Sequence, residues 1–218
     1  MSNKLALFDC DGTMVDSQAN ICASMDQAFT KHGLVPPDHH QVRRIVGLSL
    51  IEAVSRLLPE GDEDIVAAVT QSYKDGFFEM RQAGGVHEPL YEGLLETLEE
   101  LEASGWVLGV ATGKSDRGLR HVLEVHGLLD RFVTLQTADR HPSKPHPAMV
   151  ELAMAEAGAT RSTTAMIGDT SFDMAMAVNA KVRPVGVDWG YHDEHELRDA
   201  GAEIVAASMA DLSGILNR

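Results

Sequence analysis

The chain has 218 residues, a hydrophobic share of 44% and a formal net charge of −15. This length suits one domain with a smaller insert, and the composition is that of an ordinary globular protein. No basic stretch offsets the acidic surplus, so we expect no nucleic-acid partner. No apolar run approaches the roughly 20 residues of a membrane span, so we expect no membrane partner. Two cysteines and no signal-peptide pattern indicate a cytoplasmic protein, which we expect to be a monomer or a homodimer.

A short apolar run near the start of the chain leads directly into paired carboxylates. Leu5 to Phe8 is typical of a buried strand, and Asp9 and Asp11 at its end project to the same side of the backbone. Gly12 then lets the chain turn away. Two carboxylates on one side repel each other unless a cation lies between them or one is protonated. The pattern favours a hard metal held by oxygens or a nucleophile beside an acid, although an Asp-rich turn has the same composition.

Residues 17–86 show helical periodicity throughout. Helices are predicted up to Gly33, from Asp38 to Val46, from Leu50 to Leu58 and from Asp62 to Met80. We interpret this stretch as a helical insert that forms a second small domain. The chain crosses into it near Asp16-Ser17 and out of it near Gly84-Gly85, and these crossings are the expected hinges.

From Glu92 onward, helices and strands alternate. Strands are predicted at 107–111, 132–135, 164–167, 182–187 and 203–205, with helices at 94–101, 117–125 and 147–157. Such alternation is typical of a parallel sheet with helices on both faces. The predicted fold class is therefore α/β: a Rossmann-like core of residues 1–16 and 87–218, with an all-helical insert at 17–86.

Three further polar motifs each follow an apolar run. Thr112-Gly113-Lys114-Ser115 offers a hydroxyl and a glycine N–H at a strand-to-helix turn, which is a small cradle for an oxyanion. Ser143-Lys144-Pro145-His146-Pro147 holds one lysine beside prolines, and Gly168-Asp169-Thr170-Ser171-Phe172-Asp173 adds two carboxylates. Each motif taken alone is explained by a helix cap, a polar loop or an acidic turn. Four such motifs in this order are hard to attribute to chance.

Together the motifs resemble those of the haloacid dehalogenase superfamily, in the branch that is similar to phosphoglycolate phosphatase. The matching residues are Asp9-x-Asp11-Gly12-Thr13-x-x-Asp16, Thr112-Gly113, Lys144-Pro145 and Gly168-Asp169-x-x-x-Asp173. The resemblance implies that residues 17–86 form a cap and that the sheet has the strand order 3-2-1-4-5. In such a sheet, ligands collect where the order reverses, between strands 1 and 4.

The resemblance also implies a phosphatase that needs Mg²⁺ and hydrolyses a small phosphorylated metabolite through an aspartyl-phosphate. Asp9 would be the nucleophile, and Asp11 would protonate the leaving oxygen and then deprotonate the attacking water. An Asp9 carboxylate oxygen, the Asp11 backbone carbonyl and Asp169 would hold the Mg²⁺ ion, since all three offer oxygen ligands.

Other matching residues would bind the phosphoryl group. The resemblance assigns this role to Thr112, Gly113 and Lys144, and it places Asp173 behind them, orienting Lys144 or a metal-bound water. Phosphoglycolate is the leading substrate, while pyrophosphate, sugar phosphates and nucleoside monophosphates remain open. A second anionic group on the substrate would meet a basic cap residue, for which Arg44 is the candidate beside Arg43, Lys74 and Arg81, although each also fits a solvated helix face.

Two alternatives stay open. One is a sugar-phosphate mutase of the same superfamily, but such mutases carry a histidine where this chain has Ile21 and an arginine where it has Leu50. The other is a non-enzymatic phosphoacceptor domain, in which the acceptor aspartate lies on a middle strand and no long helical insert is present. The differences from the mutases and from the phosphoacceptor domains both favour a hydrolase.

Histidines are frequent, and three pairs are candidate metal ligands: His39 with His40, His121 with His126, and His192 with His195. None is accompanied by further His, Cys or carboxylate ligands at a suitable spacing. We therefore expect these histidines to lie at the surface.

Overall fold

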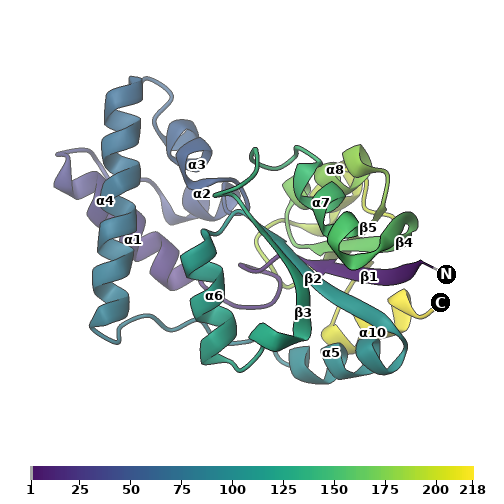
Figure 1. Cartoon of the computed structure of the whole chain (residues 1–218). Helices are drawn as coiled ribbons and strands as arrows, with labels where there is room; N and C mark the ends of the chain where they lie inside the picture. Colours follow the sequence, from purple (N-terminus) through teal and green to yellow (C-terminus); the bar gives the residue numbers. More distant parts are fainter. Residues whose placement is uncertain (1) are drawn as a thin grey trace.

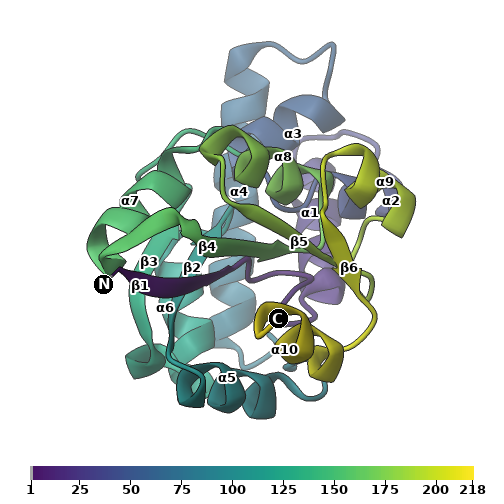
Figure 2. The same ribbon diagram turned by 90° about the vertical axis from the view of Figure 1, so that its right-hand side faces the viewer.

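The structure is a computed structural model that describes residues 2–218. In this part of the chain, six parallel strands form one sheet in the order β3-β2-β1-β4-β5-β6 (Figures 1 and 2). The strands are β1 Asn3–Phe8, β2 Trp106–Thr112, β3 Phe132–Thr137, β4 Ala159–Gly168, β5 Arg183–Val187 and β6 Ile204–Ala206. The α/β fold class and the order 3-2-1-4-5 are confirmed, and β6 extends the sheet beyond β5.

Helices cover both faces of this sheet. They are α5 Leu94–Ala103, α6 Asp116–Val125, α7 Ala148–Ala157, α8 Ser171–Ala180, α9 Glu194–Asp199 and α10 Met209–Leu216, with the short 3-10 helix η1 at Leu129–Arg131. In β1, Leu5 and Leu7 pack into the apolar cluster of α7 and α8, whereas Ala6 and Phe8 pack into the cluster of α5, α6 and α10. A strand covered on both faces has no polar side, which explains the uninterrupted apolar run from Leu5 to Phe8.

The chain between β1 and β2 folds into the helices α1 Gln18–Lys31, α2 His39–Arg44, α3 Leu50–Leu57 and α4 Glu63–Gln82. The side chains of Asp38 and Asp62 cap α2 and α4, because each accepts a hydrogen bond from a backbone N–H of the first turn. These helices share their own apolar cluster, which includes Met25, Phe29 and Val54. Figure 1 shows them at the end of the molecule opposite the two termini, facing the carboxyl end of β1.

The carboxyl ends of β1, β2 and β4 therefore meet at the edge of the sheet that faces the helical insert. The central position of β1 between β2 and β4 brings the loops after these three strands together. Of the helices in residues 2–218, even the long helix α4 lacks the apolar character that a segment crossing a bilayer requires.

Candidate active site

Three carboxylates from two strand ends and one helix converge at this edge. Asp9 follows β1, Asp169 follows β4, and Asp173 lies in the first turn of α8. One oxygen of each lies within 4.8 Å of the others, and all three residues are buried. Asp173 is held in place because its Oδ2 accepts hydrogen bonds from the N–H and the hydroxyl of Thr170 in a capping box.

Lys144 supplies the positive charge of this cluster. Its Nζ lies 2.7 Å from Asp173 Oδ1 and 2.9 Å from Asp9 Oδ2, and its side chain is completely buried. Burial alone would lower the pKa of this ammonium, but the charges of Asp173 and Asp9 outweigh burial and raise it. Lys144 therefore stays protonated and is shared between the two carboxylates.

Asp9 is the least satisfied of the three carboxylates. Its Oδ1 accepts a hydrogen bond of 2.6 Å from the N–H of Cys10, but no group in residues 2–218 donates a well-formed hydrogen bond to its Oδ2. Burial raises the pKa of Asp9 from 3.8 to about 7, although the nearby Lys144 acts in the opposite direction. Apart from its ion pair with Lys144, the Oδ2 of Asp9 has no hydrogen-bond donor among the described residues, so it can still contact a bound ligand.

Asp169 is enclosed by backbone. Its Oδ1 accepts a hydrogen bond of 2.7 Å from the Thr13 hydroxyl, and its Oδ2 accepts one of 3.0 Å from the N–H of Tyr191. A Cβ atom at Gly12 or Gly190 would lie 2.2 or 2.1 Å from Asp169 atoms, so only glycine permits these two loops to approach so closely. Burial, together with the charges of Asp173 and Asp9, raises the pKa of Asp169 well above its ordinary value.

The donor set suits a hard divalent cation. Three buried carboxylates share a single ammonium, so the cluster carries a surplus of negative charge that burial makes unfavourable. All available ligand atoms are carboxylate oxygens, one from each of the three residues. Oxygen-only sites of this kind favour Mg²⁺, Ca²⁺ or Mn²⁺ over softer metals.

The carboxylate of Asp11 points away from this cluster toward a second ion-pair network. Its Oδ1 accepts hydrogen bonds of 2.7 Å from Lys114 Nζ and 2.5 Å from the Ser17 hydroxyl. Lys114 also lies 2.8 Å from the buried carboxylate of Glu88, and the two acids together raise the pKa of Lys114 despite its burial. Lys114 belongs to the motif Thr112-Gly113-Lys114-Ser115, but the sequence predicted no role for it or for Glu88. The position of Lys114, two residues after the end of β2 at this edge of the sheet, was the sequence feature that could have indicated its role.

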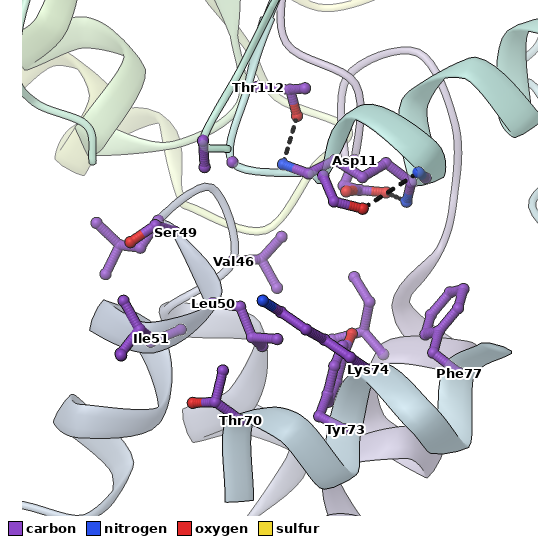
Figure 3. A pocket seen from close by; sticks show the side chains of 18 of the residues that line it. Asp11, Val46, Ser49, Leu50, Ile51, Thr70, Tyr73, Lys74, Phe77 and Thr112 are labelled. Carbon is purple, nitrogen blue, oxygen red and sulfur yellow. Dashed lines mark hydrogen bonds and ion pairs between the residues drawn. The ribbon is translucent and has the colours of Figure 1, made fainter. Parts of the chain in front are cut away.

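The core and the helical insert enclose a cavity of about 480 Å³ between them (Figure 3, in which the core is drawn at the top). Asp9, Asp11 and Thr112 line its floor, and Gly113 lies at the point where the insert approaches. A Cβ atom at Gly113 would lie 2.3 Å from the carbonyl oxygen of Leu48, so any larger residue would push the insert away. Thr112 Oγ1 accepts a hydrogen bond of 3.2 Å from the N–H of Lys114, which leaves its own proton free to donate.

A family model described as haloacid dehalogenase-like hydrolase matches residues 6–187, which is most of the chain. The chain belongs to this family. The resemblance recognised in the four motifs is confirmed, and so is the prediction that the protein is an enzyme.

Known relatives of this hydrolase span nearly its whole length. Probable phosphatase IndB of Dickeya dadantii is 36% identical over 216 residues, covering 96% of this chain and 92% of the relative. A phosphoglycolate phosphatase of Vibrio parahaemolyticus is 30% identical over 217 residues, covering 96% and 94%. Pyrophosphatase PpaX of Bacillus pumilus is 28% identical over 214 residues, with the same two coverages. The crystal structure of a predicted phosphatase from Clostridium acetobutylicum matches with a TM-score of 0.88 and 25% identity, covering 99% of both chains.

Two expectations from the sequence differ from what the structure of this hydrolase shows. Arg44, expected to meet the substrate, does not line the cavity; its guanidinium forms a two-pronged ion pair with Glu196 of α9. His192, expected at the surface, is buried: its Nδ1 accepts a hydrogen bond from the Ser171 N–H, and its Nε2 lies 3.2 Å from the carbonyl oxygen of Arg44. Both residues join the helical insert to the core. The expected residues Asp9, Asp11, Thr112, Gly113 and Lys144 do lie around the cavity floor.

Proposed function

We propose that this hydrolase is a Mg²⁺-dependent phosphatase that cleaves a small phosphate monoester through an aspartyl-phosphate on Asp9. The observation that carries this proposal is the carboxylate of Asp9 itself. It lies on the floor of the cavity, where its Oδ2 pairs with the ammonium of Lys144 at 2.9 Å and has no other hydrogen-bond donor among the described residues. A buried carboxylate beside a fixed positive charge suits a nucleophile that attacks a negatively charged phosphoryl group.

In the first step, an oxygen of Asp9 forms a bond to phosphorus while the bond from phosphorus to the ester oxygen breaks. Asp11 lies on the cavity floor with its Oδ1 held by Ser17 and Lys114, and its other oxygen donates a proton to the departing alkoxide, which leaves as the alcohol. In the second step, Asp11 accepts a proton from the water that attacks phosphorus, and inorganic phosphate is released with Asp9 regenerated. Ser17 and Lys114 fix the Asp11 carboxylate through hydrogen bonds of 2.5 and 2.7 Å.

The phosphoryl group is bound from several sides. The hydroxyl of Thr112, whose oxygen already accepts a hydrogen bond from Lys114, donates to one phosphoryl oxygen, and the N–H of Gly113 donates to another. The ammonium of Lys144 stabilises the charge that spreads over the phosphoryl oxygens in the transition state. Asp173 keeps this ammonium in place at 2.7 Å.

Asp9, Asp169 and the backbone carbonyl of Asp11 are the proposed ligands of Mg²⁺. The metal supplies positive charge that offsets the repulsion between the carboxylate of Asp9 and the phosphate. Asp173 lies within the same group of carboxylates, but its oxygens are already occupied by Lys144 and Thr170, so we assign it to holding Lys144.

Phosphoglycolate is the first substrate to examine, because relatives carry the name phosphoglycolate phosphatase, and pyrophosphate is the second. We propose that residues 17–86 act as the cap that covers the substrate, with the core made of residues 1–16 and 87–218. The free thiols of Cys10 and Cys22 are both buried, which supports a location in the reducing cytoplasm.

The test is phosphate release from a panel of phosphate monoesters, p-nitrophenyl phosphate included, in the presence of Mg²⁺. Wild-type protein should release phosphate, and Asp9→Asn should release none while remaining folded. Asp199→Asn serves as the matched control, since Asp199 is exposed and distant in the chain from every motif. The proposal would be refuted if Asp9→Asn released phosphate, or if the wild-type protein released none from any of the esters.

A further inference from the structure

The cavity has a polar floor and an apolar roof, and the roof belongs entirely to the helical insert. Helices α3 and α4 and the turn before α3 supply most of it. The apolar and aromatic residues of the roof that Figure 3 labels are Val46, Leu50, Ile51, Tyr73 and Phe77. A concave, largely apolar wall opposite a few fixed polar groups is the usual form of a small-molecule site.

Parts of this apolar roof lie open to water. Ile51 is 56% exposed and Phe78 is 38% exposed, and both line the cavity. Single exposed apolar side chains are common on proteins, but those that gather on the wall of a cavity gain from a ligand that removes them from water. The wall therefore favours a ligand with an apolar surface of its own.

Lys74 is the roof cation that is free to meet such a ligand. Its side chain rises from α4 into the cavity (Figure 3), and it forms no ion pair within residues 2–218. The other cations that line the cavity have partners of other kinds, although the buried Nε of Arg81 has no hydrogen-bond partner among the described residues. Lys114 contacts Asp11 and Glu88, whereas Arg81 and Arg117 stack on phenylalanine rings at 5.3 and 4.6 Å.

Thr70 supplies a second unused polar group. It lines the same cavity, is only 6% exposed, and its hydroxyl has no hydrogen-bond partner among the described residues. Buried hydroxyls are normally satisfied, so this one is available to a polar atom of a bound ligand.

We propose that the leaving group of the substrate is a bulky alcohol with an apolar body of about ring size and one acidic or hydrogen-bond-accepting group, which Lys74 binds. This inference rests on the phosphatase function proposed above and adds the class of leaving group. Phosphoglycolate would offer its carboxylate to Lys74 but would leave the apolar roof in contact with water. A sugar would bring many hydroxyls against Leu50, Ile51 and Phe77, where they find no partners.

Closing of the roof onto the floor would not alter this preference. The helices of the insert share one apolar cluster, so α3 and α4 approach the core together. Such a motion would change the distance between roof and floor, but it would leave the roof apolar.

The first experiment compares kcat/KM for ethyl phosphate, 2-phenylethyl phosphate and glucose 6-phosphate, all esters of unactivated primary alcohols. Because one methylene in an apolar pocket changes kcat/KM by about 10-fold or more, the phenyl ring should raise it by about 10–100-fold over ethyl phosphate. Ile51→Ser should reduce this ratio. Val125→Ser should not, because Val125 is 65% exposed and lies outside the cavity.

The second experiment compares phosphoglycolate with ethyl phosphate to measure recognition of the acidic group. A hydrogen bond to a charged group contributes roughly a 10-fold preference, so Lys74→Met should lower kcat/KM for phosphoglycolate about 10-fold more than it lowers kcat/KM for ethyl phosphate. Lys31→Met is the matched control, since Lys31 is an exposed lysine at the end of α1, outside the cavity.

A binding measurement separates this inference from the proposed reaction. The non-hydrolysable 3-phenylpropylphosphonate should raise the Tm of the Mg²⁺-loaded protein more than propylphosphonate does, and Ile51→Ser should shrink the difference. Equal Tm shifts, or a kcat/KM for glucose 6-phosphate above that for 2-phenylethyl phosphate, would overturn the inference about the leaving group. Absence of turnover of every ester, with the difference in Tm intact, would overturn the phosphatase function alone.

Discussion

The stability of the metal-free protein should depend on pH through Asp9, and Asp9→Asn should remove that dependence. Burial raises the pKa of Asp9 in the folded protein from 3.8 to about 7. Between these two values the folded protein holds a proton that the unfolded chain has already released. The unfolding free energy of the wild-type protein therefore falls as the pH rises from about 4 to about 7.

The size of the effect follows from the shift in pKa. A shift of about three pH units, at about 1.4 kcal/mol for each unit, corresponds to about 4 kcal/mol. Asn has nearly the shape of Asp but carries no charge, so the variant avoids this cost at pH 8. The attraction between Lys144 and the ionised Asp9 is already contained in the pKa of about 7, so it needs no separate correction when the two pH values are compared.

The assay is urea unfolding in excess chelator at pH 4.5 and pH 8, for the wild-type protein, Asp9→Asn and the exposed control Asp199→Asn. From pH 4.5 to pH 8, Asp9→Asn should gain about 2–4 kcal/mol relative to wild type, with no such gain in the control. Added Mg²⁺ should stabilise the wild-type protein at pH 8 more than the variant, because the cation binds only the folded state and the amide of the variant would offer it no carboxylate oxygen. A variant that follows the wild-type pH dependence would refute the assigned environment of Asp9.

Three further predictions concern the proton donor, the second ion-pair network and the metal. Asp11→Asn should lower kcat on an alkyl phosphate by about 10²–10⁴-fold and by less on p-nitrophenyl phosphate, whose leaving group needs no proton; equal losses on both esters would refute the acid role. Lys114→Met should lower the unfolding free energy by about 3 kcal/mol in urea titrations, because it leaves the buried carboxylates of Asp11 and Glu88 unpaired; a loss no larger than that of Lys31→Met would contradict this. Chelation should abolish phosphate release, Mg²⁺ should restore it, and Ca²⁺ should inhibit through its looser coordination; full activity in excess chelator would rule out the metal site.

The floor of the site was predictable from the sequence because its residues follow directly on buried strands. Leu5 to Phe8 lacks any polar side, which marks a central parallel strand, and the position of Asp9 and Asp11 follows from it. The carboxyl ends of parallel strands share one edge of the sheet, so motifs distant in the chain had to meet there. Strand ends and turn residues are local features, and local features are what a sequence pattern records.

The start of β4 was not predictable in the same way. The strand begins at Ala159, five residues before the apolar run at Thr164, and its first residues are mostly exposed. Polar residues at an exposed strand end resemble a loop in sequence. Pairing of Ala159 with Asn3 of β1 makes this segment a strand, and that pairing joins distant parts of the chain.

The contacts that join the insert to the core also could not be predicted from the sequence. Arg44 of the insert and Glu196 of the core lie 152 residues apart. Within the core, the ion pair of Lys114 with Asp11 likewise joins residues 103 positions apart. Nothing in the sequence around Arg44 distinguishes an arginine that binds substrate from one that docks a helix onto the core. The choice depends on which carboxylate the packing of α2 against α9 places nearby.

The charges of the floor couple the binding of metal to the binding of substrate. Without a cation, a phosphate dianion would enter a site in which Asp9, Asp169 and Asp173 face the single ammonium of Lys144. The high pKa values of Asp9 and Asp169 show that this arrangement already disfavours further negative charge. A divalent cation reverses the balance at short range, where screening by salt is weak, so the net charge of −15 on the whole chain does not oppose binding. Because the two binding events then favour each other reciprocally, phosphate should tighten the affinity for Mg²⁺ by the same factor by which Mg²⁺ tightens the affinity for phosphate.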